Sequence, residues 1–177
     1  MKNSLFASIL VVLIGGFFAS AVVADDTLVR FKGGIGVIPV SNVAGTANPD
    51  GTFANVTRNI VRLVNSAGQI WVISALRADV KVEGSIHVDG RGLLLGGGNQ
   101  IGFNANASVF ATLFCEAAAP FTPHSTSLTG VPLQPDGDFL INDVLSPAPP
   151  SPCVSPVLLI RVTGASPDWF AAGIPRQ

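Results

Sequence analysis

A strict alternation of polar and apolar residues between Arg77 and Arg91 constrains the fold of this chain more than any other feature. The odd-numbered positions are all polar, namely Arg77, Asp79, Lys81, Glu83, Ser85, His87, Asp89 and Arg91. Side chains of a β-strand alternate between its two faces, so this pattern predicts one wet face and one buried face. The residues expected to point inward are Val80, Val82, Ile86 and Val88. Val82→Asp should then unfold the domain, whereas Lys81→Asp should be tolerated.

The same stretch fits either one long strand or a hairpin. A two-residue turn at Glu83-Gly84 would mix the two faces, which a half-buried strand forbids. A three-residue loop over 83–85 would keep the faces matched, but it would set Asp79 opposite Asp89. Like charges directly opposite each other destabilise a sheet. We therefore favour a single long strand, bent at the glycine.

Residues 1–24 predict a secretory signal peptide. Lys2 gives a short positive start, residues 5–18 are uncharged and apolar, and small residues lead up to Ala24. Two aspartates follow at once, which fits cleavage after Ala24. The alternative is an uncleaved membrane anchor, because the apolar stretch is just long enough to span a bilayer. We favour cleavage, which leaves residues 25–177 as one domain, secreted or periplasmic, without stable insertion in a membrane.

The charge balance of the chain argues against one class of partner. Lys and Arg together number 10, Asp and Glu number 11, and no basic run occurs. Nucleic-acid binding needs a basic patch or stripe, so we expect no nucleic-acid partner. Charged residues make up only 12% of the chain, so Ser, Thr, Asn, Gly and Pro must form much of the surface. This composition is typical of an extracellular β-domain.

Short apolar runs between Gly, Pro and Asn turns predict about nine strands. The two clearest buried strands are 108–115 and 157–162, which are apolar on both faces. Gly33-Gly34 inside the first strand suggests a β-bulge. No long segment after residue 24 shows a helical period. We expect an all-β, antiparallel β-sandwich of Greek-key, immunoglobulin-like or jelly-roll type, with a barrel-like Greek key as the alternative.

The chain has two cysteines, Cys115 and Cys153. In an exported protein these predict one disulfide, which would tie the strand 108–115 to the proline-rich segment 146–152. The closed loop of about 39 residues corresponds to about 4 kcal/mol in the chain-entropy model. The alternative is a reactive thiol, but no histidine lies within five residues of either cysteine.

His87 and Asp89 are the best candidates for a metal site. They lie two residues apart on the wet face, so they project the same way and could supply two ligands. An ordinary solvated strand face explains them as well, and we favour that interpretation. The acidic stretch 136–143 has enough oxygen atoms for calcium, but a turn explains it better. We therefore assign no catalytic residue, metal or cofactor, and we expect His124 to lie on the surface.

Two classes of function remain open. The first is a non-catalytic binding module for an unknown protein or glycan, which should show an exposed apolar patch or an open sheet edge. The second is a hydrolase or metal-dependent enzyme with a site around His87 and Asp89. That enzyme would need one of the two histidines in a concave pocket beside a carboxylate.

Three segments resemble those of small, exported, uncharacterised bacterial β-domain proteins. They are VDGRGLLLGGGNQIG (88–102), DVLSPAPPSPC (143–153) and WFAAGIP (169–175). The resemblance implies a bacterial source, and it brings no activity, ligand or site residue with it.

Overall fold

The structure is a computed structural model that describes residues 26–176, and it confirms the all-β antiparallel class. The signal peptide predicted for residues 1–24 lies outside the described residues. Within 26–176, no helix is long and apolar enough to cross a membrane. In chain order the strands are β1 (Thr27–Gly36), β2 (Val40–Ala47), β3 (Phe53–Arg58), β4 (Trp71–Val72), β5 (Ala75–Lys81), β6 (Ser85–Arg91), β7 (Leu94–Leu95), β8 (Ser108–Phe114), β9 (His124–Ser125), β10 (Val131–Pro132), β11 (Phe139–Val144), β12 (Val157–Val162) and β13 (Trp169–Pro175).

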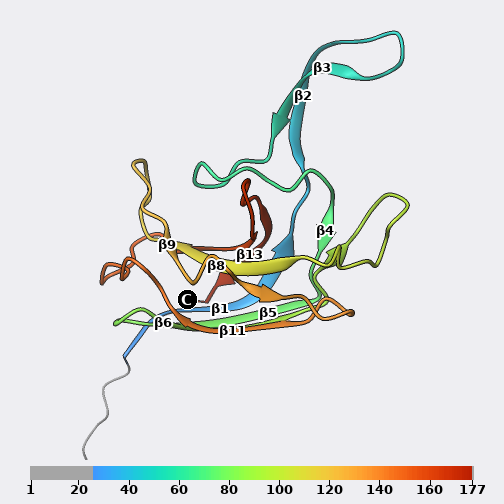
Figure 1. Ribbon diagram of the computed structural model, residues 1–177. Helices are drawn as coiled ribbons and strands as arrows, with labels where there is room; N and C mark the ends of the chain where they lie inside the picture. Colours follow the sequence, from blue (N-terminus) through green and yellow to red (C-terminus); the bar gives the residue numbers. More distant parts are fainter. Residues whose placement is uncertain (1–25, 177) are drawn as a thin grey trace, which may run out of the picture.

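Nine of these strands belong to one sheet that curls toward a barrel (Figure 1). Its path runs β10-β8-β12-β13-β1-β5-β6-β11, and β9 pairs with β8 beside that path. The backbone N–H groups of Ser125 and Ser146 each donate to the other residue's carbonyl, at 3.0 and 2.8 Å. This bridge joins β9 to the chain just past β11, so the two ends of the sheet meet. The structure therefore shows one curled sheet where we expected the two sheets of a sandwich.

The glycine pair in β1 forms the predicted bulge. The register of β1 against β13 shifts between Phe31 and Gly34, and Gly33 takes a φ of +102°. A Cβ on Gly34 would lie only 2.9 Å from the Cβ of Leu76, so the backbones approach closely there. Bulges bend a strand and increase its twist, so this one contributes curvature that a nearly closed sheet needs.

β8 is buried on both faces, as its sequence predicts. One face points into the barrel, and side chains from elsewhere in the chain cover the other. Phe121 packs edge-on against Phe114 with ring centroids 6.4 Å apart. The guanidinium of Arg161 lies 5.3 Å from the ring centroid of Phe110. Aromatic and cation–π contacts of this kind let a strand be apolar on its outer side.

The alternating stretch is a hairpin and not the single long strand that we expected. β5 and β6 pair with Asp79 opposite His87 and Arg77 opposite Asp89, so the repulsive carboxylate pair does not form. The loop covers residues 82–84, one residue earlier than the three-residue loop considered above. The N–H of Gly84 donates to the carbonyl of Lys81 at 2.9 Å, and Gly84 takes a φ of +96°. Glycine accepts this conformation without strain, which fixes the register.

This register corrects the predicted inward face. Val80, Ile86 and Val88 are buried in the core, as predicted. Val82 lies in the loop and its relative exposure is 43%, so the prediction that it points inward is wrong. The expectation that Val82→Asp unfolds the domain is withdrawn for the same reason.

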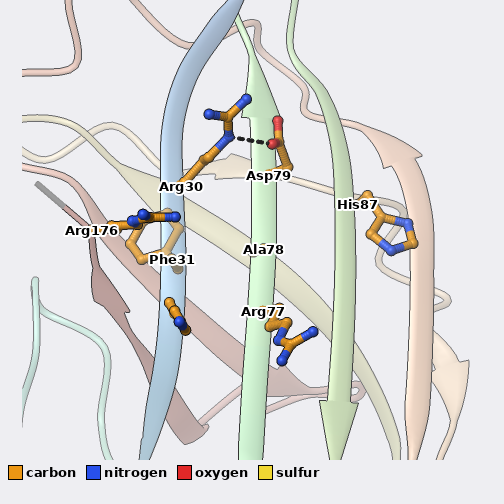
Figure 2. Close-up of a pocket in the computed structure, with 8 residues that line it drawn as sticks. Arg30, Phe31, Arg77, Ala78, Asp79, His87 and Arg176 are labelled. Atoms are coloured by element: carbon orange, nitrogen blue, oxygen red, sulfur yellow. Dashed lines mark hydrogen bonds and ion pairs between the residues drawn. The ribbon is translucent and has the colours of Figure 1, made fainter.

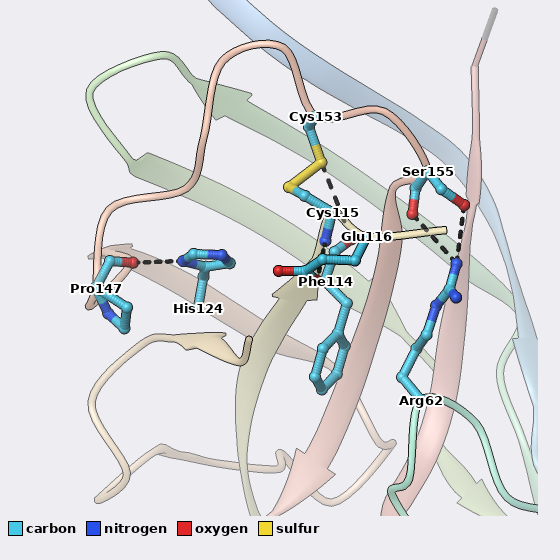
Figure 3. The surroundings of a disulfide bond; sticks show 8 residues. All are labelled: Arg62, Phe114, Cys115, Glu116, His124, Pro147, Cys153 and Ser155. Atoms are coloured by element: carbon cyan, nitrogen blue, oxygen red, sulfur yellow. Dashed lines mark hydrogen bonds between the residues drawn. A yellow bond between two sulfur atoms is a disulfide. The ribbon is translucent and has the colours of Figure 1, made fainter. Parts of the chain in front are cut away.

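The predicted disulfide between Cys115 and Cys153 is present (Figure 3). Their Cα atoms are 4.7 Å apart, and Cys115 follows directly on the end of β8. The bond ties this strand to the end of the proline-rich segment 146–152, as expected. It closes the part of the chain that contains β9, β10 and β11.

We predict that Val80→Ala lowers the free energy of unfolding by about 2 kcal/mol, because it removes buried methyl groups and leaves a cavity. Val82→Ala should change it by no more than about 0.5 kcal/mol, since that side chain lies in an exposed loop. Urea denaturation measures both. Equal losses in the two variants would show that the hairpin register is wrong.

The double variant Cys115→Ala/Cys153→Ala should lose about 4 kcal/mol of stability, because the unfolded chain regains the freedom of the open loop. Chemical denaturation of the purified domain, compared with wild type under non-reducing conditions, measures this loss. Unchanged stability would mean that the loop is held without the crosslink.

Candidate functional site

The outer face of the sheet carries a row of polar side chains across four strands. β1, β5, β6 and β11 contribute Arg30, Asp79, His87 and Asn142, each opposite the next. Arg30 Nε donates to Asp79 Oδ2 at 2.8 Å, and His87 Nδ1 bonds the side-chain oxygen of Asn142. The wet face predicted from the alternation is therefore confirmed, and its residues are ordered by cross-strand neighbours.

Beside this row lies a depression of about 390 Å³ (Figure 2). Phe31 and Ala78 are paired across β1 and β5, and both side chains point into the core. Because neither residue places a side chain on the outer face, only backbone lies between the polar rows. The residues that line the depression are Arg30, Phe31, Lys32, Arg77, Ala78, Asp79, His87 and Arg176.

The depression is strongly basic. Asp79 is the single carboxylate among its lining residues, and it is paired with Arg30. Lys32 on β1 stands directly opposite Arg77 on β5. Arg176 follows β13 and is held beside β1, because its backbone N–H donates to the carbonyl of Arg30 at 2.8 Å. Among the described residues, no ion pair joins Lys32, Arg77 or Arg176 to an acid.

His87 and Asp89 project from the same face, as predicted, but they do not build a metal site. Asp89 accepts hydrogen bonds from Arg91 at 2.7 and 3.3 Å. His87 lies in the depression and uses Nδ1 to bond Asn142. Over residues 26–176, no three His, Cys, Asp or Glu side chains gather as a metal-binding group.

In the acidic stretch 136–143, Asp136 and Asp138 belong to the turn before β11, and Asp143 lies within β11. Asp138 accepts hydrogen bonds from the Arg91 side chain at 2.7 Å and from the Gly92 N–H at 3.0 Å. Asp136 accepts the N–H of Asp138 at 3.1 Å. The hydrogen bond from Arg91, together with that from Gly92, holds the pKa of Asp138 below its ordinary value.

His124 is buried, contrary to the expectation that it lies on the surface. Its relative exposure is 4%, and its Nδ1 lies 2.8 Å from the carbonyl oxygen of Pro147 (Figure 3). β9 places it opposite Leu113 of β8, beneath the proline-rich segment. Its Nε2 has no hydrogen-bond partner in the part of the chain that the structure describes. The polar residues next to His124 in the sequence did not indicate that the proline-rich segment buries it.

A second exposed feature is the arm, the hairpin formed by β2 and β3, which projects away from the curled sheet (Figure 1). Every residue of both strands is exposed. Val43 pairs with Val56, and Val40 pairs with Arg58. Directly paired residues share a face, and so do residues two apart in a strand. One face of the arm, the valine face, therefore carries Val40, Val43 and Val56.

Hydrogen bonds hold the arm at its base. The N–H of Asn59 donates to the carbonyl of Pro39 at 2.9 Å, and the indole N–H of Trp169 donates to the carbonyl of Asn59 at 3.1 Å. Arg58 bonds Ser66 and lies 3.7 Å from a carboxylate oxygen of Asp168. The base of the arm is thus fixed to the curled sheet.

The tip of the arm is ordered as well. Asp50 accepts both the N–H and the hydroxyl of Thr52, at 2.9 and 2.6 Å. These bonds, the hydroxyl first, hold the pKa of Asp50 below its ordinary value. Asn48 and Thr52 are joined by backbone and side-chain hydrogen bonds. Hydrogen bonds therefore order the arm at both ends, and the exposed valines lie between them.

Comparison of the chain with protein-family models, with curated proteins and with solved structures found no significant match. The geometry of this chain is therefore the basis for its function. Sequence reasoning missed Lys32, Arg176 and the arm. The alternation of 77–91 identified Arg77 as exposed, but no local pattern showed that segments so far apart in the chain converge on it.

We predict that Asp138 stabilises the fold in a pH-dependent way. Its folded-state pKa lies below the ordinary value of 3.8, so its stabilising effect is present above that pH and disappears as the pH falls through the lowered pKa. Asp138→Asn should lower the melting temperature at pH 6, and the difference from wild type should vanish toward pH 2. A difference that stays constant over this range would contradict the role of the charged carboxylate.

Proposed function

We propose that this protein is a secreted or periplasmic, non-catalytic binding module that engages a partner protein through the valine face of the arm. The observation that carries the proposal is an ordered hairpin whose middle exposes Val40, Val43 and Val56 to solvent. A two-stranded hairpin is at best marginally stable in water unless a further strand or an apolar surface covers it. A partner would supply that cover.

Export is supported by two independent features. Residues 1–24 have the charge, apolar run and small residues of a signal peptide. The disulfide between Cys115 and Cys153 is of the kind that persists in oxidising compartments outside the cytosol.

The chemistry of the arm favours a protein over a charged polymer. Asp50 is engaged by Thr52, and Arg58 by Ser66 and Asp168. No other charged residue occurs in the strands and turn of the arm. An anionic glycan or nucleic acid needs cations to bind it, whereas an apolar face and open strand edges suit another polypeptide.

The order of the arm also supports a binding role. Its tip and base are fixed by hydrogen bonds, so little conformational entropy remains to be lost when a partner binds. An edge strand exposed without a function is an aggregation hazard that proteins usually block with charge or proline. On the valine face the one charged residue is Arg58, which lies at the base of the arm, so charge does not block the middle of this face.

A metal-dependent or hydrolytic site around His87 and Asp89 is the weaker candidate. His87 does line a depression that also contains Asp79, as such an enzyme would require. However, both oxygens of Asp89 accept hydrogen bonds from Arg91, and His87 Nδ1 is bonded to Asn142. An acid and a base held this way are poorly placed to act on a substrate.

Site-specific photo-crosslinking in the cells that produce the protein tests the proposal. A photo-reactive benzoylphenylalanine replaces Val56 on the valine face in one variant and Thr57 on the opposite face in a matched control. We expect one discrete adduct from position 56 and none from 57. Val43→Lys should reduce the adduct from position 56 about tenfold, because a charge replaces the apolar contact.

Equal adducts from positions 56 and 57, or none from either, would overturn the proposal. An adduct with the mass of two copies of this chain would also overturn it, since the arm would then be a contact between identical subunits. Because Val43 is exposed, Val43→Lys should change the stability by no more than about 0.5 kcal/mol, so lost binding is separable from lost folding.

A further inference from the structure

We propose that the basic depression on β1, β5 and the end of β13 binds a small ligand through a phosphate or sulfate group. This site is separate from the arm, and it does not depend on the function proposed for the arm. Three cations converge there from parts of the chain that are far apart in sequence, namely Lys32, Arg77 and Arg176.

Lys32 and Arg77 form a pair of like charges at the depression. These residues are directly opposite on neighbouring antiparallel strands and both are exposed. Side chains so paired start about 5 Å apart at Cβ, and like charges in this position destabilise a sheet. Elsewhere among the described residues of this face, charged pairs in register join unlike charges, such as Arg30 with Asp79 and Arg77 with Asp89. An anion bound between Lys32 and Arg77 would turn the repulsion into two attractions.

The neighbouring acids do not neutralise this pair. Asp89 faces Arg77 across the strands, but it accepts two hydrogen bonds from Arg91. Asp79 is paired with Arg30 at 2.8 Å and lies 3.8 Å from Lys81. Both carboxylates therefore interact with other cations, and the Lys32 end of the depression keeps a net positive charge.

Arg176 adds a third cation at the same end. Pro175 pairs with Phe31, and the Arg176 N–H donates to the carbonyl of Arg30, which fixes the backbone next to the depression. Figure 2 shows Arg176 on the β13 side of the depression and Arg77 on the β5 side. Guanidinium groups bind tetrahedral oxyanions through paired N–H donors, so two arginines and a lysine suit a doubly charged group.

The shape limits the ligand. Phe31 and Ala78 form the floor of the depression and leave backbone exposed between the rows of side chains. A volume of about 390 Å³ is at the small end of ligand sites, large enough for a monosaccharide with its charged group. The group that the site recognises is the oxyanion, either free or attached to a small polar molecule.

Isothermal titration calorimetry of the purified domain at low ionic strength tests this site with four probes: inorganic phosphate, sulfate, glucose 6-phosphate and glucose. We expect glucose 6-phosphate to bind with a Kd of about 1 mM or tighter and glucose not to bind. Binding by inorganic phosphate or sulfate of equal strength would assign all recognition to the oxyanion. Stronger binding of glucose 6-phosphate than of inorganic phosphate would show that the site also contacts the attached sugar.

Arg77→Gln and Lys32→Gln should each weaken binding about tenfold, because each removes one charge-assisted contact. Arg62→Gln is the control with the same change of charge, and it should leave binding unchanged because Arg62 bonds the carbonyl of Ala117 and the Ser155 side chain and does not line the depression. Arg77→Gln should also raise the melting temperature in buffer without oxyanions, where it relieves the repulsion from Lys32. Absence of binding by all three anions, or equal weakening by Arg77→Gln and Arg62→Gln, would overturn the proposal.

Discussion

The pairing of β5 with β6, in the register that sets Val80 against Ile86, is the interaction on which the rest of the structure depends. Side chains alternate along both strands, so a slip by one residue would expose the apolar set and bury the charged one. The observed register sends the valines into the core and sets Asp79 beside His87. The separate register of β1 against β5 sets Lys32 opposite Arg77 and Arg30 opposite Asp79, and the two registers together produce the polar rows of the outer face.

The curling of the sheet also stabilises this hairpin, because β6 pairs with β11 and the chain just past β11 is bonded to β9. The bridge between Ser125 and Ser146 joins β9 to the chain that follows β11. The disulfide between Cys115 and Cys153 ties the end of β8 to the end of the proline-rich segment. A sheet closed in this way has few open edges. The arm differs from this sheet, because its two strands pair only with each other and are exposed along their whole length. These exposed strands are the basis of our proposal that the arm binds a partner.

The fold was predictable from sequence wherever burial leaves a local pattern. The alternation of 77–91 and the apolar run 108–115 both identified their buried residues, apart from Val82. Val82 was misplaced because a hairpin and a long strand share one period, and only the conformation of Gly84 decides where the loop lies. The burial of His124 left no such pattern, because its cover is a distant proline-rich segment. The basic depression was missed for the same reason.

The sequence by itself determined the all-β class, the wet face of the alternating stretch and the disulfide, since only two cysteines exist to form it. The tertiary structure alone decided that one sheet curls on itself, that the arm leaves it, and that Arg176 meets Lys32 and Arg77. The physical reason is the range of the interactions. Side-chain alternation records whether each residue is buried, whereas strand order and cross-strand neighbours arise from pairing between segments far apart in the chain.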